Sequence, residues 1–305
     1  MSFSLTILGS SGALPAIGRF PSSQYLTIQN RHFLIDCGEG VQMQMGKFQV
    51  SPQKIDHIFI SHLHGDHYLG LMPLLFSMHL NKRTNDLHLY SQPGLDEIIT
   101  LQLKYSKSVL NYRIHFHPFN PSQVRTLFED EVLTVETIPL IHKLDCAGFL
   151  FREKPKPRRV DKDRLVDGLK TQQIASLKTG ADILDEKGNL LYRNEDLTLP
   201  PRSSLSYAYC SDTAWNEVMI PQITGADLLY HEATFMQEDM DKAIETKHST
   251  TLQAAEIAQR AEVKKLILGH FSARYKDLEL VLNEAKTLFE NTELAIEGTT
   301  FTLHD

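Results

Sequence analysis

One stretch of the chain, residues 55–67, decides the fold and reads Ile-Asp-His-Ile-Phe-Ile-Ser-His-Leu-His-Gly-Asp-His. Its mostly apolar first half predicts a buried strand over residues 55–61. Three imidazoles and a carboxylate follow directly, at His62, His64, Asp66 and His67. In an extended backbone, residues two apart point to the same side, so His62 and His64 can bind one ion. Gly65 permits a sharp turn that carries Asp66 and His67 toward a second ion.

A lone histidine in such a place is usually a surface residue or a satisfied core residue. Four ligand-type side chains in H-x-H-x-D-H order, directly after a strand, favour a metal site instead. Imidazole and carboxylate without thiolate favour zinc or a similar first-row metal. The stretch therefore predicts a site for a pair of metal ions.

The bulk composition is that of a globular protein of 305 residues, long enough to bury a sizeable core. A formal net charge of -7 gives no global basic field, so a nucleic-acid substrate requires a local basic patch. The three cysteines, Cys37, Cys146 and Cys210, form no C-x-x-C pair, which indicates a reducing cytoplasm. The most apolar run, residues 69–78, is too short to span a membrane and contains Pro73. We therefore expect a cytoplasmic protein without a membrane partner.

Strands and helices alternate at both ends of the chain, and hairpin-like strands lie in the middle. A capping-box pattern at Thr250 and Gln253 predicts a helix start just after His248 and Ser249. This order predicts an α/β protein with two sheets and helices outside them. The expected strands are 4–8, 25–28, 31–36, 55–61, 87–90, 132–139, 146–151, 205–211, 228–231 and 265–269, and the expected helices are 41–48, 69–80, 95–106, 251–260 and 278–288.

Residues 152–201 differ from the rest of the chain. Over residues 152–164, seven basic side chains face only Glu153, Asp161 and Asp163. Pro155 and Pro157 deny this part a helix, and a short helix is expected over 163–177. A solvated, mobile surface loop is one interpretation; an arm that holds phosphate backbones is the other, and the basic excess in an acidic chain favours the arm. The basic residues are Arg152, Lys154, Lys156, Arg158, Arg159, Lys162 and Arg164.

A two-metal site needs more ligands than one loop supplies. His142, Asp212 and His270 each come directly after an apolar run, where a sheet presents functional residues at its rim. Taken singly, such residues often only cap or turn; together with the first motif they complete the number and types required. Asp212 is the natural bridge, because one carboxylate can bind two ions.

The H-x-H-x-D-H motif after a strand resembles the metallo-β-lactamase superfamily, whose members hydrolyse many kinds of ester. Longer motifs sharpen the resemblance to the ribonuclease Z family, the endonucleases that process the 3′ end of tRNA. Two segments are narrower markers of that family, His231-Glu232-Ala233-Thr234 and His248-Ser249-Thr250. The other segments that carry the likeness are 36–40, 141–149, 211–213 and 269–275.

The resemblance implies one four-layer αβ/βα sandwich over residues 1–305. It also implies a substrate-clamping arm at residues 152–201, which makes the insertion an expected tRNA-binding exosite. The insertion departs from the family in one respect, because it lacks the Gly-Pro motif that the bacterial family's arm usually contains.

The resemblance further implies two Zn²⁺ per chain, one on His62, His64 and His142 and the other on Asp66, His67 and His270. Asp212 and a water would bridge them, and the hydroxide derived from that water would attack phosphorus in line. Asp66 would accept the proton of the water, and His248, held by Glu232, would protonate the leaving 3′-oxygen. The expected substrate contacts are Arg274, Ser249, Thr250, Lys154, Lys156, Arg158 and Arg159.

Three functions remain open from the sequence. The first is a zinc-dependent endoribonuclease that removes the 3′ trailer of precursor tRNA and leaves a 3′-hydroxyl; the resemblance to the family implies a homodimer. The second is a hydrolase of small phosphodiesters or other esters. The third is a metal-bearing RNA-binding protein without catalysis. The basic insertion and the two marker segments favour the first over the second, and the complete ligand set argues against the third.

Overall fold

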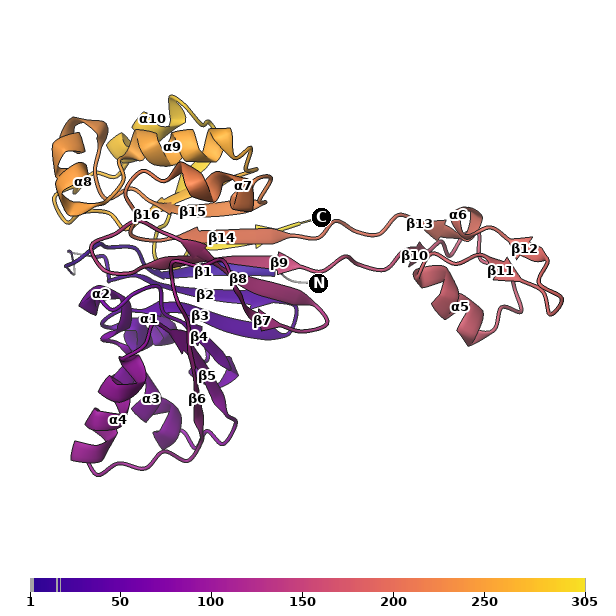
Figure 1. Cartoon of the computed structure of the whole chain (residues 1–305), viewed down its shortest axis with the longest axis horizontal. Helices are drawn as coiled ribbons and strands as arrows, with labels where there is room; N and C mark the ends of the chain where they lie inside the picture. Colours follow the sequence, from indigo (N-terminus) through magenta and orange to yellow (C-terminus); the bar gives the residue numbers. More distant parts are fainter. Residues whose placement is uncertain (1–2, 15, 17, 305) are drawn as a thin grey trace.

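Two seven-stranded sheets pack face to face in the computed structural model, with helices on both outer faces (Figure 1). The structure describes residues 3–14, 16 and 18–304. The strand order of the first sheet is β18-β1-β2-β3-β4-β5-β6, and that of the second is β17-β16-β15-β14-β9-β8-β7. The αβ/βα sandwich predicted from the sequence is confirmed.

The first sheet and its helices come from the first 118 residues, with the last strand of the chain added at one edge. The outer face of this sheet packs under α1, α3 and α4 through leucine, isoleucine and methionine side chains. The elements are β1 (Phe3–Gly9), β2 (Ser23–Ile28), β3 (Arg31–Cys37), α1 (Val41–Lys47), η1 (Pro52–Lys54), β4 (His57–Phe59), α2 (Gly65–Tyr68), α3 (Leu71–Leu80), β5 (Leu87–Ser91), α4 (Leu95–Tyr105), β6 (Ile114–Pro118) and β18 (Thr300–Leu303).

The second sheet is covered on its outer face by α7, α9 and α10. The predicted capping box is present: the Thr250 hydroxyl accepts from the Gln253 amide, and α9 begins at Thr251. The elements are β7 (Thr126–Glu129), β8 (Leu133–Pro139), β9 (Ala147–Glu153), β14 (Ser206–Cys210), η2 (Glu217–Met219), α7 (Ile220–Ile223), β15 (Leu228–Glu232), η3 (Gln237–Asp239), α8 (Met240–Thr246), α9 (Thr251–Arg260), β16 (Leu266–Gly269), α10 (Glu279–Lys286) and β17 (Thr292–Leu294).

The space between the sheets is filled by a large apolar cluster rich in aromatic rings. Phe33, Phe59, Phe149, Tyr209 and Tyr230 are all completely buried there. They alternate along their strands with residues that face the helices, which is the pattern of strands buried on both faces. This core fixes the strand ends that carry the polar side chains described below.

The inserted segment forms an arm that projects from the sandwich and ends in a small lobe (Figure 1). Two chain segments outside the β-strands, between β9 and β10 and between β13 and β14, form its stalk. Leu177, Ile183 and Leu197 form a core of their own inside the lobe, with Leu169 and Tyr192 packed against it. The elements of the lobe are β10 (Arg159–Val160), α5 (Thr171–Lys178), β11 (Ile183–Leu184), β12 (Leu190–Tyr192), α6 (Asn194–Leu197) and β13 (Thr198–Leu199).

The arm helix predicted over 163–177 begins only at Thr171, so that prediction was wrong by two turns. Gly168 has a φ of 89°, which a continuous right-handed helix excludes. Lys170 is extended and forms the N-cap, with its amide bonded to the Gln173 side chain at 2.9 Å. Elsewhere in the described chain, no helix is long and apolar enough to cross a bilayer.

Candidate metal centre

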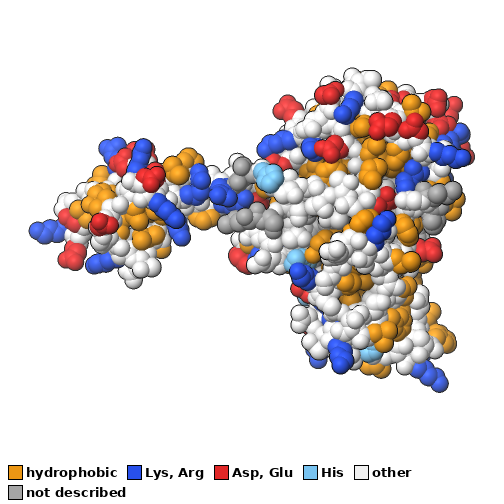
Figure 2. Space-filling model, turned by 180° about the vertical axis from the view of Figure 1, so that it is seen from behind, with side chains coloured by type: hydrophobic (Ala, Val, Ile, Leu, Met, Phe, Trp, Pro, Cys, Tyr) orange, Lys and Arg blue, Asp and Glu red, His pale blue; other side chains and the backbone are white. Residues whose placement is uncertain are grey.

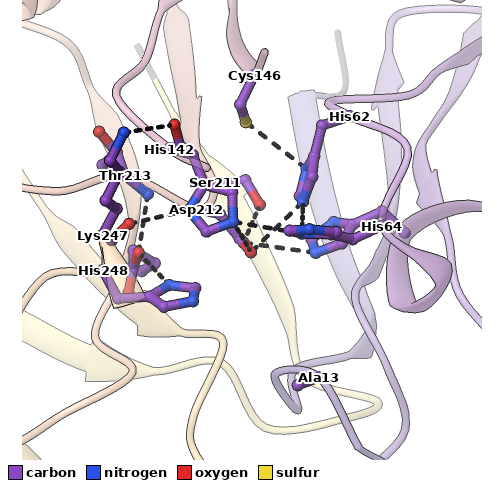
Figure 3. Close-up of polar contacts among 12 residues, drawn as sticks. Ala13, His62, His64, His142, Cys146, Ser211, Asp212, Thr213, Lys247 and His248 are labelled. Carbon is purple, nitrogen blue, oxygen red and sulfur yellow. Dashed lines mark hydrogen bonds and ion pairs between the residues drawn. The ribbon is translucent and has the colours of Figure 1, made fainter. Parts of the chain in front are cut away.

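The predicted ligands come from four strand ends that meet at one edge of the sandwich. His62 follows β4, His142 follows β8, Asp212 follows β14 and His270 follows β16. Asp66 and His67 lie in the short helix α2, which begins directly after His64. The structure therefore brings all seven predicted ligand residues together, although they are spread over more than two hundred positions of the sequence. Figure 3 labels four of them, His62, His64, His142 and Asp212.

The ligand atoms form two groups on either side of Asp212. His62, His64 and His142 make one group with this carboxylate, and Asp66, His67 and His270 make the other. Asp212 Oδ2 lies 3.5 Å from His62 Nε2 and 3.7 Å from His142 Nε2. Asp212 Oδ1 lies 3.4 Å from His67 Nε2 and 3.1 Å from His270 Nε2. Each oxygen of one carboxylate thus faces a different group, which is the arrangement of a bridging ligand.

Four of these histidines have Nδ1 engaged by protein, and Nε2 faces the centre. His67 Nδ1 lies 2.7 Å from Asp36 Oδ2, and His142 Nδ1 lies 2.9 Å from the carbonyl oxygen of Lys247. His62 Nδ1 lies 3.1 Å from the Ser61 hydroxyl, and His270 Nδ1 lies 2.9 Å from the Thr234 hydroxyl. A bond at one ring nitrogen fixes the ring and leaves the other nitrogen for a cation.

Asp36 is a functional residue that reasoning from the sequence did not place in the site. It is the last residue but one of β3, has a φ of 54° and is completely buried. Its carboxylate accepts from the Ser61 amide at 2.7 Å and from the Tyr209 hydroxyl at 2.6 Å, besides its contact with His67. Its place after the apolar run of β3 is the same signal that marks the three later ligands, so the sequence does carry the information that could have found it.

The electrostatics of the centre follow from burial and crowded charge. Burial, aided by the neighbouring His67, holds the pKa of His62 well below its usual range. Burial alone would raise the pKa of Asp66, but the neighbouring His67 and His270 outweigh it and hold this pKa far below normal. At His67 burial disfavours the charged form, but the carboxylates of Asp212, Asp66 and Asp36 outweigh it and raise its pKa well above the usual range. A divalent cation that binds this imidazole takes the place of its proton.

His248 and Glu232 form a pair next to the ligands. His248 Nδ1 lies 2.7 Å from Glu232 Oε1, and Glu232 is completely buried. Burial disfavours the charged form of His248, but the Glu232 carboxylate outweighs it and raises the pKa of His248 to about 9. The contact that the sequence suggested between these two residues is present, and His248 lies beside His142 and His270.

The centre opens to solvent through a cleft of about 450 Å³. Asp66, His142, Asp212, His248 and His270 line it. Ala13 closes one side, and its amide donates to Asp66 Oδ2 at 2.8 Å. A phosphodiester that enters this cleft meets the bridging carboxylate and His248 together.

Known ribonucleases Z are similar to this chain over its whole length. The ribonuclease Z of Cytophaga hutchinsonii is 48% identical over 305 residues, covering 100% of this chain and 97% of that protein. The ribonuclease Z of Bacteroides thetaiotaomicron is 43% identical, covering 99% and 96%. Residues 3–155 also match the family model described as anti-Pycsar protein Apyc1. The chain belongs to the ribonuclease Z family.

Solved structures support the same family. The crystal structure of the short form of human tRNase Z matches with a TM-score of 0.70 at 25% identity and covers 98% of each chain. YhfI of Bacillus subtilis, a metallo-β-lactamase fold protein, matches with a TM-score of 0.69 at 20% identity and covers 99% of each chain, which shows the fold alone. The chain is thus a tRNA 3′-processing endoribonuclease of the metallo-β-lactamase fold, as its motifs predicted.

Two predicted substrate contacts of this ribonuclease Z lie elsewhere than expected. Ser249 is buried and its hydroxyl donates to the Thr213 carbonyl oxygen at 2.7 Å. Thr250 is completely buried and its hydroxyl caps α9 and donates to Gln237. Both hydroxyls bond to protein in the interior, so we exclude them from the substrate surface. Their position next to His248 in the sequence did not reveal which way they point.

Arg274 is partly exposed but lies outside the residues that line the cleft. Its guanidinium is 3.0 Å from Asp239 Oδ2 and 5.0 Å from the centre of the Phe235 ring. A guanidinium held by a carboxylate and a ring is oriented in advance, and it can still present its remaining N–H groups to a phosphate.

The basic residues predicted to hold RNA line one cavity along the stalk, between the sandwich and the lobe. Figure 2 shows Lys and Arg side chains gathered where the arm joins the sandwich, besides others spread over the lobe. Lys154, Lys156, Arg158 and Arg159 line a cavity of about 500 Å³ together with Lys178 and Arg202. We call this the root cavity. Residues 160–199, in contrast, hold six basic and eight acidic side chains, and one of the six, Lys178, also lines the root cavity. The basic excess inferred for the whole insertion therefore belongs to its root.

Proposed function

We propose that this ribonuclease Z cuts precursor tRNA at the two-group centre and leaves a 3′-hydroxyl on the tRNA. The observation that carries the proposal is the division of Asp212, whose two oxygens face two separate sets of nitrogen and oxygen ligands. A site for one ion does not need a second set of ligands on the other oxygen of the same carboxylate. The centre is suited to a reaction in which two cations act on one phosphate.

The donor set fits two zinc ions. Five imidazoles and two carboxylates converge without a thiolate, which suits zinc better than calcium or magnesium. His67 Nε2 is buried and, among the described residues, has no hydrogen-bond partner, although it points at Asp66 and Asp212. A bound cation removes the cost of that buried nitrogen. Bound zinc would supply an acidified water and polarise the phosphate oxygens.

Asp66 is the residue we assign to orient the attacking water. Its Oδ2 is held by the Ala13 amide and lies 3.3 Å and 3.4 Å from the Nε2 atoms of His67 and His270. As the oxygen of the water bonds to phosphorus, Asp66 takes the proton that the water loses. Its low pKa makes it a weak base alone, so it acts by position more than by basicity.

His248 is the residue we assign to the leaving group. When the bond between phosphorus and the 3′-oxygen breaks, that oxygen needs a proton to become the 3′-hydroxyl of tRNA. The Glu232 carboxylate binds His248 at Nδ1 and keeps it protonated, which leaves Nε2–H to donate. The trailer departs with the 5′-phosphate. Asp66 then carries the proton of the water, and His248 has given its proton to the 3′-oxygen.

The root cavity is the part of the arm we assign to the RNA backbone. Phosphates bind where basic side chains are dense and partly exposed, and release counterions as they bind. Lys154 and Lys156 are paired with Glu129 and Glu153, at 2.6 Å and 2.7 Å, which orients them along the stalk. The surface is thus preformed for a polyanion, although the chain as a whole is acidic.

The place of the arm supports a homodimer. The ligand residues lie before β9 and after β14, while the arm leaves from the other ends of the same two strands. β9 alone has seven residues, so roughly 24 Å separates the two ends. An arm that points away from its own centre is placed to hold RNA bound at the centre of a second copy. The buried, free cysteines support a cytoplasmic location.

The test of the function is a cleavage assay on a precursor tRNA with a 3′ trailer, with the product ends mapped. We expect one cut after the discriminator nucleotide, a 3′-hydroxyl on the tRNA, and loss of activity on zinc chelation. Cleavage only of small phosphodiesters would contradict the assignment. For the dimer, an arm-deleted chain mixed with an Asp66→Ala chain should cleave precursor tRNA at low substrate concentration faster than the sum of the two chains measured alone.

A further inference from the structure

Thr234 stands at the meeting point of the ligand His270 and the pair formed by His248 and Glu232. It is buried, with 7% of its surface exposed. Its hydroxyl lies 2.5 Å from Glu232 Oε2, 2.9 Å from His270 Nδ1 and 3.3 Å from His248 Nδ1. No other described hydroxyl contacts both a residue of the second ligand group and the pair assigned to the leaving group.

The single proton of this hydroxyl decides the direction of the bonds. The hydroxyl has two acceptors in reach, Glu232 Oε2 at 2.5 Å and the His270 carbonyl oxygen at 3.1 Å. The carboxylate is the nearer and the stronger, so Thr234 donates to Glu232. The oxygen then has only lone pairs left for the imidazole at 2.9 Å. His270 must therefore donate from Nδ1, and its Nε2 keeps a free lone pair beside Asp212 Oδ1 at 3.1 Å.

We propose that Thr234 is a positioning residue that fixes the tautomer of His270 for the second metal ion and ties this ligand to Glu232. The inference rests on the proposed metal centre. His67 and His142 are held at Nδ1 by a carboxylate and by a backbone carbonyl, both of which can only accept. At His270 the acceptor is the hydroxyl oxygen of Thr234. This oxygen can only accept from the imidazole, because its own proton is donated to Glu232.

The consequence is a link between the metal ligand and the leaving-group residue. Glu232 accepts from Thr234 at one oxygen and from His248 at the other, with the Thr213 and Thr234 amides completing its contacts. Removal of the hydroxyl leaves His270 Nδ1 without its acceptor and frees the ring to turn or change tautomer. Outer partners of metal-bound histidines typically contribute about 10–100-fold in metal affinity.

The experiment measures zinc affinity without substrate, by equilibrium competition with a chromophoric chelator. In Thr234→Val, which keeps the shape and removes the hydroxyl, we expect one of two ions to bind about 10–100-fold more weakly. Thr234→Ser restores the hydroxyl and should return within about threefold of wild type. Thr251→Val is the matched control, because its buried hydroxyl bonds only the Phe235 carbonyl oxygen and contacts no proposed ligand.

Several outcomes overturn the inference. Equal losses in the valine and serine variants would mean that side-chain packing matters and the hydroxyl does not. Unchanged affinity in Thr234→Val would remove the role altogether. If Thr234→Val does not fold, as judged by circular dichroism, the nitrogen chemical shifts of His270 in zinc-loaded wild type decide: a proton on Nε2 refutes the proposal. Failure of the metal centre itself appears differently, as wild-type protein that binds no zinc tightly.

Discussion

The predicted metal ligands are held at the edge of a large, closely packed sandwich, whereas the arm stands outside it with a core of only a few side chains. Around the centre, His62, His67 and Asp36 have no exposed surface, and their polar atoms are held by neighbouring side chains. In the lobe, Leu177, Ile183 and Leu197 carry the packing, and Leu184, Leu190 and Leu191 remain about half exposed. Ligand side chains held 3–4 Å apart require a rigid sandwich around them. Binding of a long polyanion requires instead a segment that extends from the sandwich and carries many basic side chains.

The largest effect should come from the ligand that is also assigned to the water. Asp66→Ala removes a cation ligand and a proton acceptor together, so turnover should fall by several orders of magnitude. Affinity for precursor tRNA should change much less, because the root cavity is untouched. Single-turnover kinetics and a binding assay measure the two separately. Glu39→Ala is the matched control, since Glu39 lines the same cleft outside both ligand groups.

A variant of Asp66 that keeps turnover within tenfold of wild type would rule out its assigned role. It would also weaken the contrast between the ligand site and the arm, because the sandwich would then tolerate the loss of a carboxylate at the centre of the site.

The second largest effect should come from His248. His248→Ala should slow cleavage of precursor tRNA by about 10² to 10⁴, the range of a lost general acid. The loss should be far smaller on an activated aryl phosphodiester, whose leaving group needs no proton. Equal losses on the two substrates would make His248 a structural or binding residue. Glu232→Gln, which keeps the shape and weakens the charge beside His248, should show the same difference between substrates on a smaller scale.

The same contrast explains what the sequence could and could not predict. The ligands His142, Asp212 and His270 follow apolar strands directly, so their positions are a local property of the chain. Thr234 lies in a marker segment of the sequence, but its contact with His270, and that of Lys247 with His142, arise only where loops meet in the fold. Ser249 and Thr250 sit in the right segment but face the interior. In the arm, composition located the basic residues without showing that they gather at the root, and Gly168 ended the predicted helix.

The arm gives a third test, with an effect on affinity and not on chemistry. Deleting residues 154–198, with a short Gly/Ser bridge, removes most of the root cavity and the lobe but no proposed ligand. The separate core of the lobe leads us to expect that the sandwich folds without it. Hydrolysis of a small phosphodiester should persist, while affinity for precursor tRNA falls and depends less on salt. Loss of small-ester turnover as well would show that the segment supports the sandwich.

Charge variants sharpen the difference between root and lobe. Replacing Arg159, Lys178 and Arg202 with glutamine should weaken binding of precursor tRNA. It should also reduce the slope of log K against log salt by about 1 for each phosphate that the root cavity no longer binds. The matched variant replaces Lys162, Lys170 and Lys187 of the lobe and changes the net charge equally. Equal weakening in the two variants would mean that only total charge matters and that the root cavity is not a site.

The smallest expected effect is a loss of folding stability at low pH. It arises in the sandwich and not in the arm. His57, His88 and His115 stack across β4, β5 and β6, with ring centres 5.0 Å and 4.9 Å apart, whereas residues 152–201 contain no histidine. Burial first, and then the charge of His88, lowers the pKa of His57 to about 4. The unfolded chain binds this proton near pH 6.5, so the folded state is favoured above that value and loses stability as the pH falls toward 4. At pH 5 the loss amounts to about 1–2 kcal/mol.

Between pH 7 and pH 5, the melting temperature of His57→Phe should therefore fall by a few degrees less than that of wild type. Both proteins carry the same metal ligands, so metal loss at low pH cancels in this difference. Parallel curves would show that His57 is solvated in the folded state and that the histidine stack is no source of acid sensitivity.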